Sequence, residues 1–482
     1  MSAISETVDP RDLIDIFGFY DAELSVEEHA RASTQRFVRT HTDLSFWSEG
    51  EGGLVLTAAQ AREAFGWTVL RELLDRVTVP LIHRGCQVGP VLRERREEVQ
   101  ISVQQLARTT GLQVADIEAA EAGRRSMPMT VLTRLARALA LDPLRIGFVE
   151  NGGGDVSLGV RMRELQKVPT ASLSPTLVLG LLEAAWVIGE QSRLEAQLDA
   201  SRSRAITRLG FRPRALRDVA WPPAWQQGAD LAHETRRLLG YEAEEPIHAL
   251  LPEVEDRLAI PVVPLRMPVN FAGATIENGG TRGIVVNLNG INANVWTRRM
   301  TVAHELGHLL WDPSDDLARL RVNRYSDLTA NAQSLTDLVE MRVNAFAAEL
   351  LAPKAAVTRK YFEYGGGPEA VSRLTEEYGV SITALSWQLH NGSDGRIQQS
   401  RVRGVPNTKP SEKWRIDENR RTDFFVFDET PISRTGRFAE VSLQAYDMNV
   451  ISDHTFAESL NTSQDRLRAH IGALRSLMQP VG

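Results

Sequence analysis

One short segment of the sequence, MTVAHELGHLLWDP at 300–313, carries side chains whose types and spacing fit metal chemistry. His304 and His308 are four residues apart, so on a helix both imidazoles project from one face toward a common point. Glu305 follows the first histidine, where its carboxylate can reach a water on the metal without binding the metal itself. The segment therefore predicts two metal ligands and a general base on one helix.

A helix has to position these side chains, and the surrounding residues favour one. Val302, Leu306 and Leu309 form an apolar stripe at helical spacing. Asp312-Pro313 predicts the end of the helix, because proline cannot continue it. Two imidazoles do not complete a catalytic zinc site, which takes a third protein ligand. A carboxylate on a following helix is therefore expected.

The helix predicted over 337–351 offers that carboxylate. Glu340 and Asn344 lie on one stripe of it, and the small side chain of Ala347 would let it approach Gly307 closely. We take Glu340 as the third ligand and expect Asn344 to orient it. Spacing alone leaves several other carboxylates as alternatives, namely Asp315, Asp316, Asp327, Asp337 and Glu349.

These segments resemble the ImmA/IrrE family of zinc metallopeptidases. The resemblance is carried by GIVVNL at 283–288, RRMTVAHELGHLLWDP at 298–313, EMRVNAFAAELLAP at 340–353 and YGVSITALSWQL at 378–389. It covers about 225–392 and implies an α+β, zincin-like core. It also implies Zn²⁺ as the cofactor, His304, His308 and Glu340 as its ligands, and Glu305 as the catalytic base. The sequence departs from the family pattern at Met300, Arg342 and Ala352, none of which is a ligand.

A second segment, 91–143, predicts a series of short helices. Ser102 is a candidate N-cap, and Gly111 supplies a tight turn between two helices. The expected apolar core consists of Leu106, Ile117, Leu132, Leu135 and Leu139. This pattern resembles the XRE (Cro/repressor-like) helix-turn-helix family, which implies an all-α domain that binds DNA.

The residues that would contact DNA are less clearly marked. Candidates for base or phosphate contacts are Arg93, Gln104, Gln113, Asp116, Arg124 and Arg125. Segment 91–147 contains nine Arg and seven acidic residues, and its expected recognition helix at 113–122 is acidic. The alternative is a helical module that binds protein or positions the peptidase.

A chain of 482 residues is too long for one hydrophobic core. We expect a multidomain, mainly α protein with five parts. These are a helical N-terminal region of unknown role (1–85), the helix-turn-helix (86–147), a helical connector (148–222), the metallopeptidase domain (223–395) and a C-terminal linker with a helical tail (396–482).

Several further elements are predicted from local patterns. Helices are expected over 26–39, 58–74 and 175–209, the last with a polar end suited to a connector or to the seam of a homodimer. Strands are expected over 260–264, 283–288 and 424–427. If 283–288 is an exposed edge strand, Asn287 would help to bind an extended peptide.

Composition excludes several classes of protein. The net charge of −7 argues against a polycationic nucleic-acid coat, and the single cysteine, Cys86, forbids an internal disulfide or a cysteine-based zinc finger. The polar, acidic N-terminus is not a signal peptide, and the most apolar stretch is too short to span a membrane. We therefore expect a cytoplasmic protein with no membrane partner.

Taken together, the two resemblances imply a zinc-dependent endopeptidase coupled to a DNA-binding module. The expected substrate is a helix-turn-helix repressor or an antitoxin-like protein, such as the product of a neighbouring gene, in a stress, mobile-element or defence response. The alternative is a non-catalytic transcriptional regulator or antitoxin whose peptidase-like domain senses a signal or binds a partner. The intact Glu305 favours the enzyme, because a binding module would tolerate its loss.

Overall fold

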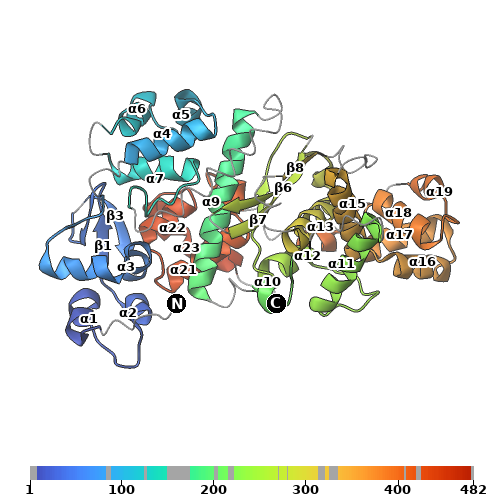
Figure 1. Ribbon diagram of the computed structural model, residues 1–482, viewed down its shortest axis with the longest axis horizontal. Helices are drawn as coiled ribbons and strands as arrows, with labels where there is room; N and C mark the ends of the chain where they lie inside the picture. The colour runs from blue at the N-terminus through green and yellow to red at the C-terminus, as the bar shows by residue number, and fades with distance from the viewer. Residues whose placement is uncertain are drawn as a thin grey trace. The chain divides into compact units, whose positions relative to one another are not determined.

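The computed structural model forms two compact units, which are described separately (Figure 1). The first holds the described residues up to Leu198 and those from Phe425 onward, and the second holds those from Asp199 to Glu418. The structure describes residues 8–50, 52–82, 88–123, 127–148, 174–199, 205–214, 222–269, 271–278, 281–312, 335–406, 409–418 and 425–478, and the backbone of 321–324.

The first unit begins with three helices and a small antiparallel sheet. The helices are α1 (Pro10–Phe17), α2 (Val26–Ala32) and α3 (Ala58–Asp75). The strands β1 (Arg36–Arg39), β2 (Asp43–Phe46), β3 (Leu54–Thr57) and β4 (Val79–Pro80) lie in the order β3-β1-β2-β4. The expectation of a helical region over 1–85 is therefore wrong for 36–57, and the helix predicted over 26–39 stops early.

Helix α2 stops early for two reasons, one at its own C-terminus and one in the pairing of the strand that follows it. Helix α2 ends at Ser33, whose hydroxyl donates to the Phe17 carbonyl across 2.8 Å. The chain then enters β1, where Val38 lies opposite Val55 of β3. Phe37, Val38 and Arg39 of β1 are all buried, so the strand lacks the two-residue alternation by which half-buried strands are recognised. The pairing partner, rather than the local pattern, determines this strand.

Four helices form the helix-turn-helix domain: α4 (Val88–Glu98), α5 (Val103–Thr110), α6 (Val114–Glu121) and α7 (Met129–Ala138). Ser102 caps α5 by accepting from the Gln105 amide, and Gly111 ends it in the left-handed conformation at φ 67°. The four leucines and one isoleucine of the expected core are all buried. Arg96 donates two hydrogen bonds to Glu121, at 2.6 and 2.8 Å, which ties α4 to α6.

Arg39 fastens the end of the helix-turn-helix domain to the N-terminal sheet. Its guanidinium is fully buried and donates to the backbone carbonyls of Pro143, at 2.8 Å, and of Leu144 and Ile146. Hydrogen bonds from a charged donor to three carbonyls offset much of the cost of burying the charge. The domain is thus packed into the unit rather than joined to it by a loose linker.

Helix α9 (Pro175–Leu198) is a buried element of the first unit that packs against α7 and α21 (Arg437–Asp447). It ends before the predicted 209. Gln191, Leu194 and Glu195 belong to the polar end that was expected to form a connector or a dimer seam, and all three are buried within the unit. Among the described residues, no helix is both long and apolar enough to cross a membrane.

The C-terminal residues complete this unit with α21, α22 (Asp453–Ser459) and α23 (Gln464–Met478). No strand forms over 425–427, so the strand predicted at 424–427 is wrong for those residues. Phe427 is buried in a core formed mainly by side chains of helices. The apolar residues 425–427 therefore form a loop that packs against this core.

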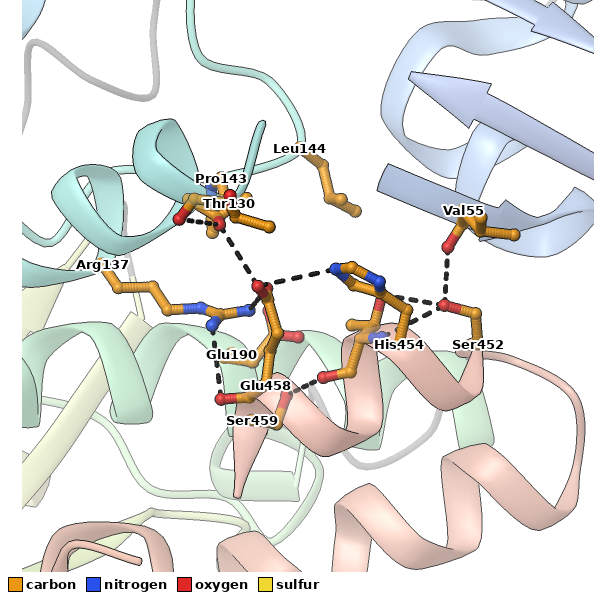
Figure 2. A network of polar contacts seen from close by, with 12 residues as sticks. Val55, Thr130, Arg137, Pro143, Leu144, Glu190, Ser452, His454, Glu458 and Ser459 are labelled. Atoms are coloured by element: carbon orange, nitrogen blue, oxygen red, sulfur yellow. Dashed lines mark hydrogen bonds and ion pairs between the residues drawn. The ribbon is translucent and has the colours of Figure 1, made fainter. Parts of the chain in front are cut away.

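A polar network connects these parts of the first unit (Figure 2). Arg137 of α7 donates to Glu458 of α22 across 2.8 Å, and His454 Nε2 lies 3.5 Å from the same carboxylate. At the N-cap of α22, the Ser452 hydroxyl donates to the Val55 carbonyl of β3 across 2.7 Å. Helix α22 therefore contacts both the helix-turn-helix domain and the N-terminal sheet.

The second unit is built from helices around a four-stranded sheet. Its helices are α10 (Ala205–Arg208), α11 (Ala224–Leu238), α12 (Leu250–Pro252), α13 (Val295–Trp311), α15 (Leu335–Leu351), α16 (Lys354–Glu363), α17 (Gly367–Tyr378), α18 (Ile382–Gly392), α19 (Gln399–Arg403) and α20 (Glu412–Asp417). Its strands are β5 (Val262–Leu265), β6 (Phe271–Asn278), β7 (Thr281–Asn287) and β8 (Arg321–Arg324). The expected fold class, mainly α with an α+β core, is confirmed.

The strand order is β5-β7-β6-β8, with β5 parallel to β7 and the other pairs antiparallel. Strand β7 is therefore internal, and the idea that 283–288 forms an exposed edge is wrong. Asn287 is fully buried, where its amide accepts from the Met267 N–H (2.8 Å) and donates to the Phe271 carbonyl (2.7 Å). This side chain holds the loop between β5 and β6 and is not available to a peptide.

Candidate metal centre

Helix α13 carries the two histidines and packs against β6, β7 and α15. Asn294 caps its N-terminus by accepting from the Trp296 amide at 2.9 Å. Nearly every residue of the helix is buried, which explains why its apolar side chains are not confined to one stripe. His304 is 2% exposed, and Glu305 and His308 are fully buried. The chemistry-bearing side chains therefore sit in the interior of the unit.

Helix α15 brings Glu340 to these histidines because the two helices approach closely at Gly307. A Cβ on Gly307 would lie 2.7 Å from the Phe346 ring and 3.0 Å from Val343. Glu340 Oε2 lies 3.3 Å from His304 Nε2, and Glu340 Oε1 lies 3.5 Å from His308 Nε2. One atom from each side chain falls within 4.8 Å of the other two. The structure thus brings together the three residues that the sequence singled out as ligands.

The donor set of this cluster fits a zinc ion. Two imidazole nitrogens and one carboxylate, with a position left for water or substrate, are a common catalytic zinc set. Within the described residues, His308 Nε2 is buried and has no hydrogen-bond partner, although it faces Glu340. A buried nitrogen without a hydrogen bond is costly, and a shared cation would satisfy it.

Each histidine is held through its other ring nitrogen. His304 Nδ1 lies 3.0 Å from Asn344 Oδ1, and His308 Nδ1 lies 2.7 Å from Asp312 Oδ2. Both contacts fix the imidazole with Nε2 directed to the cluster. Asn344 was expected to orient Glu340; it contacts His304 instead, because it lies one turn further along α15, beside the first histidine. Asp312, which the sequence had marked only as the end of the helix, performs the same task for His308.

Glu305 is placed beside the ligands by strand β6. The Thr275 hydroxyl donates to Glu305 Oε2 across 2.8 Å. Gly273 lets the strand pass closely: a Cβ there would lie 2.8 Å from Thr301 and 3.4 Å from Glu305 Oε1. Burial raises the pKa of the Glu305 carboxyl, and the neighbouring histidines oppose that shift without cancelling it. A raised pKa suits a carboxylate that takes up and returns a proton near neutral pH.

The remaining charges favour a cation at the centre of the cluster. Burial opposes ionisation of Glu340, but the adjacent imidazoles of His304 and His308 outweigh it and hold the pKa of the carboxyl well below its usual range. Burial likewise opposes a charge on His308, yet its hydrogen bond to Asp312 and the nearby Glu340 carboxylate raise its pKa to about 10. Both shifts have the same cause, which is the mutual attraction between the Glu340 carboxylate and the imidazoles beside it.

The competing carboxylates have other partners or lie outside the described side chains. Glu349 accepts from Gln388 across 2.8 Å and lies 3.3 Å from His233 Nε2. His390 of α18 has its Nδ1 3.1 Å from the Ile397 carbonyl. The side chains outside the described part are those of Asp315, Asp316, Asp327 and Asp337.

A buried ion pair holds the first half of α13. Arg299 is 1% exposed, donates to the carbonyl of Gly379 across 3.1 Å and pairs with the carboxylate of Glu418. Glu418 also accepts from the amides of Leu250 and Leu251, at 2.8 and 3.0 Å. The Arg299 guanidinium lies 4.4 Å from the centre of the Trp414 ring. Residues 414–418 thus lock onto the helix that carries the cluster; we call Arg299, Trp414 and Glu418 the α13 clamp.

The residues that were considered for DNA contact differ in their exposure and in their contacts. Gln104 and Gln113 are exposed, Asp116 is half-buried, and Arg93 donates to the Glu121 carbonyl across 2.8 Å. Arg124 and Arg125 lie outside the described residues, as does Cys86.

Comparison with known families gives one match in each of the two units. A model of the helix-turn-helix domain matches residues 87–146, and a model of the IrrE N-terminal-like domain matches residues 277–390. The second match contains all three candidate ligands and Glu305. No curated protein matches the chain. The protein therefore joins an XRE-like helix-turn-helix domain to an ImmA/IrrE-like peptidase-family domain, as the sequence resemblance predicted.

Sequence reasoning did not find Thr275, Asp312 and Arg342. Asp312 is four residues after His308, the same spacing that links the two histidines, so a signal for it was present. Arg342 stood out only as a departure from the family pattern. Thr275 is separated from Glu305 by 30 residues and a change of secondary structure, and no local pattern marks it.

Proposed function

We propose that this protein is a zinc-dependent endopeptidase that also binds DNA through its helix-turn-helix domain. The observation that carries the proposal is the convergence of His304, His308 and Glu340 within 4.8 Å, with Glu305 buried beside them. The IrrE N-terminal-like match over 277–390 supports the same chemistry. The proposed substrate is a protein. In keeping with the family resemblance, we expect it to be a helix-turn-helix repressor or an antitoxin-like product of a neighbouring gene. Both the substrate and DNA are accessible in the cytoplasm, where we place the reaction.

In this proposal, His304, His308 and Glu340 hold zinc, which when bound supplies Lewis acidity to polarise water and the scissile carbonyl. Glu305 accepts a proton from the attacking water at its carboxylate and returns it to the leaving amine. Thr275 keeps Glu305 oriented, because its hydroxyl donates to the Oε2 atom. Asn344 and Asp312 keep the imidazoles turned with Nε2 toward the cluster.

The test compares the wild type with Glu305→Gln. Both should bind about one zinc per chain by elemental analysis, because Glu305 is not a ligand. Only the wild type should cleave co-expressed products of neighbouring genes, followed by mass spectrometry. Glu363→Gln, an exposed acid on α16, serves as the control and should behave as the wild type.

Two results would contradict the proposal in different ways. A wild-type chain without zinc removes the metal centre. Zinc in both variants with the same fate of every partner removes the hydrolytic step and favours a regulator whose peptidase-like domain senses a signal.

For the DNA-binding part, Gln104 and Gln113 would contact base edges, because both are exposed on α5 and at the start of α6. Asp116 is a weaker candidate, being half-buried, and Arg93, Arg124 and Arg125 would contact phosphates.

Replacing Gln104 and Gln113 with Ala should weaken binding to the protein's own promoter in fluorescence anisotropy. Gln398→Ala, an exposed glutamine of the second unit, is the control. Replacing Arg124 and Arg125 should flatten the salt dependence. No promoter binding by the intact protein at low salt would reject this half of the proposal.

A further inference from the structure

We propose that Asp312 and Arg342 act as positioning residues for His308, and that they link it to Arg214. This inference rests on the proposed metal centre. It goes further by assigning a task to two side chains that do not touch the metal, one of which departs from the family pattern. Asp312 is 1% exposed and Arg342 is 2% exposed.

Asp312 is built into the end of helix α13. Its backbone amide donates to the His308 carbonyl across 3.1 Å, which places its side chain over the same turn. The carboxylate then reaches back so that Oδ2 lies 2.7 Å from His308 Nδ1. With Nδ1–H donated to Asp312, Nε2 is the ring nitrogen that faces the cluster, and the contact also makes that nitrogen a better ligand.

Arg342 completes the arrangement from helix α15. Its Nη2 group donates to Asp312 Oδ1, so each carboxylate oxygen has its own partner. A buried carboxylate next to an imidazole needs a compensating charge to stay ionised. The guanidinium supplies this charge and leaves Asp312 as an acceptor for His308. An acid at position 342 would instead repel Asp312.

The chain of contacts continues to residue Arg214. Arg342 Nη1 donates to the Arg214 carbonyl across 2.9 Å, and the Arg214 amide donates to the Trp311 carbonyl across 2.8 Å. The Arg214 guanidinium also lies 5.4 Å from the centre of the Trp311 ring. The circuit therefore closes on the last turn of α13, next to Asp312. A displacement of Arg214 would move Arg342, and through Asp312 it would reach the ring of His308.

A buried ion pair can also serve only to tie two helices together, and the test has to separate the two roles. The measurement is the zinc dissociation constant of the full chain, by competition with a chromophoric chelator, together with the visible spectrum of the cobalt-substituted protein. Asp312→Asn should weaken zinc binding by roughly 10- to 100-fold, the range known for residues that orient metal-bound histidines. It should also change the cobalt bands, which report ligand geometry.

The control is Glu418→Gln, which breaks the other buried ion pair on α13, between Glu418 and Arg299. It should lower the unfolding temperature but leave zinc affinity and the cobalt spectrum unchanged. Arg342→Gln keeps Asp312 in place and gives a second test if Asp312→Asn does not fold. It should weaken zinc binding in the same direction, and the double variant should lose less than the product of the two single effects.

The possible outcomes are distinguishable. Zinc affinity that is unchanged in Asp312→Asn and in Arg342→Gln, or lowered equally in Glu418→Gln, overturns the positioning role while the metal centre stands. A wild-type chain that binds no zinc overturns the metal centre and this inference together. Selective loss in the Asp312 and Arg342 variants supports it.

Discussion

Arg137 of the helix-turn-helix domain donates to the carboxylate of Glu458 across 2.8 Å, although 321 residues separate them in the chain. Both side chains are largely buried, with 9% and 17% of their surface exposed. The same guanidinium lies 5.2 Å from the centre of the Trp186 ring of α9, with Arg434 over that ring at 4.7 Å. The helix-turn-helix domain is therefore anchored by charges from the far end of the chain (Figure 2).

The ion pair between Arg137 and Glu458 should make the stability of the first unit sensitive to acid. Burial alone would raise the pKa of Glu458, but Arg137 and His454 outweigh it and lower that pKa to about 2. Because the pKa is lower in the folded than in the unfolded chain, the stabilisation is complete above the unfolded value of about 4.3. It is lost as the pH falls toward 2. Glu458→Gln should lower the free energy of unfolding by about 3 kcal/mol at neutral pH.

The measurement is the difference in unfolding temperature between wild type and Glu458→Gln from pH 7 down to the lowest pH at which the wild type folds. The difference should shrink below about pH 4.3. Asp465→Asn, whose side chain is 97% exposed, should show little difference at any pH. A constant difference for Glu458→Gln across this range would contradict the assigned ionisation.

Gly228→Ala should destabilise the second unit. A Cβ on Gly228 of α11 would lie 2.0 Å from the carbonyl oxygen of Arg342 on α15, and a backbone atom cannot turn aside. We expect a loss of about 3 kcal/mol, at the upper end for overpacking, measured by thermal unfolding. Gly472→Ala on α23 is the matched control: its Cβ would meet nothing within 4 Å, so it should be neutral or stabilising by up to about 1 kcal/mol. Equal unfolding temperatures for the two variants would refute the close approach of α11 and α15.

Arg39→Met should loosen the end of the helix-turn-helix domain. Burial lowers the pKa of Arg39 to about 10, so the side chain is still charged at neutral pH when it holds three backbone carbonyls. Its loss should cost about 3 kcal/mol, because the carbonyls remain buried without their donor. Amide hydrogen exchange should accelerate over 139–148, and Arg11→Met, at an exposed position, should leave it unchanged. Unaltered exchange there in Arg39→Met would show that other contacts hold this segment.

Zinc should stabilise the second unit. At a free concentration one hundred times its dissociation constant, a ligand specific for the folded state adds about 2.7 kcal/mol. The unfolding temperature of this unit should rise with zinc and fall again with a chelator. The double variant His304→Ala/His308→Ala should not respond, whereas His233→Ala, which contacts Glu349 instead, should respond as the wild type does. A zinc response that survives in the double variant would place the bound ion elsewhere.

The parts of the candidate site that the sequence revealed are those encoded by local spacing. His304, Glu305 and His308 lie on one helix, and Glu340 lies on the helix expected to follow. The capping of α5 by Ser102 and the turn at Gly111 are likewise decided within a few residues. Such features depend on helical geometry, which a periodic sequence expresses directly.

The other features of the site and of the fold depend on which elements pack against each other in space. Asn344 was placed on the correct face of α15, but its partner is set by the crossing of α13 and α15 at Gly307. Thr275 reaches Glu305 only because β6 runs along α13. Strand β1 was mistaken for helix because its identity comes from pairing with β2 and β3. Four residues carry too little pattern to reveal a partner that lies elsewhere in the chain.

The α13 clamp has a practical consequence for dividing this protein into pieces. The IrrE N-terminal-like match ends at residue 390, and a fragment cut there would retain every candidate ligand. It would nevertheless leave the Arg299 guanidinium buried without Glu418 and would uncap the amides of Leu250 and Leu251. Removing one partner of a buried ion pair costs about 3–5 kcal/mol, comparable to the whole stability of many domains. A fragment meant for expression on its own should therefore extend through Glu418.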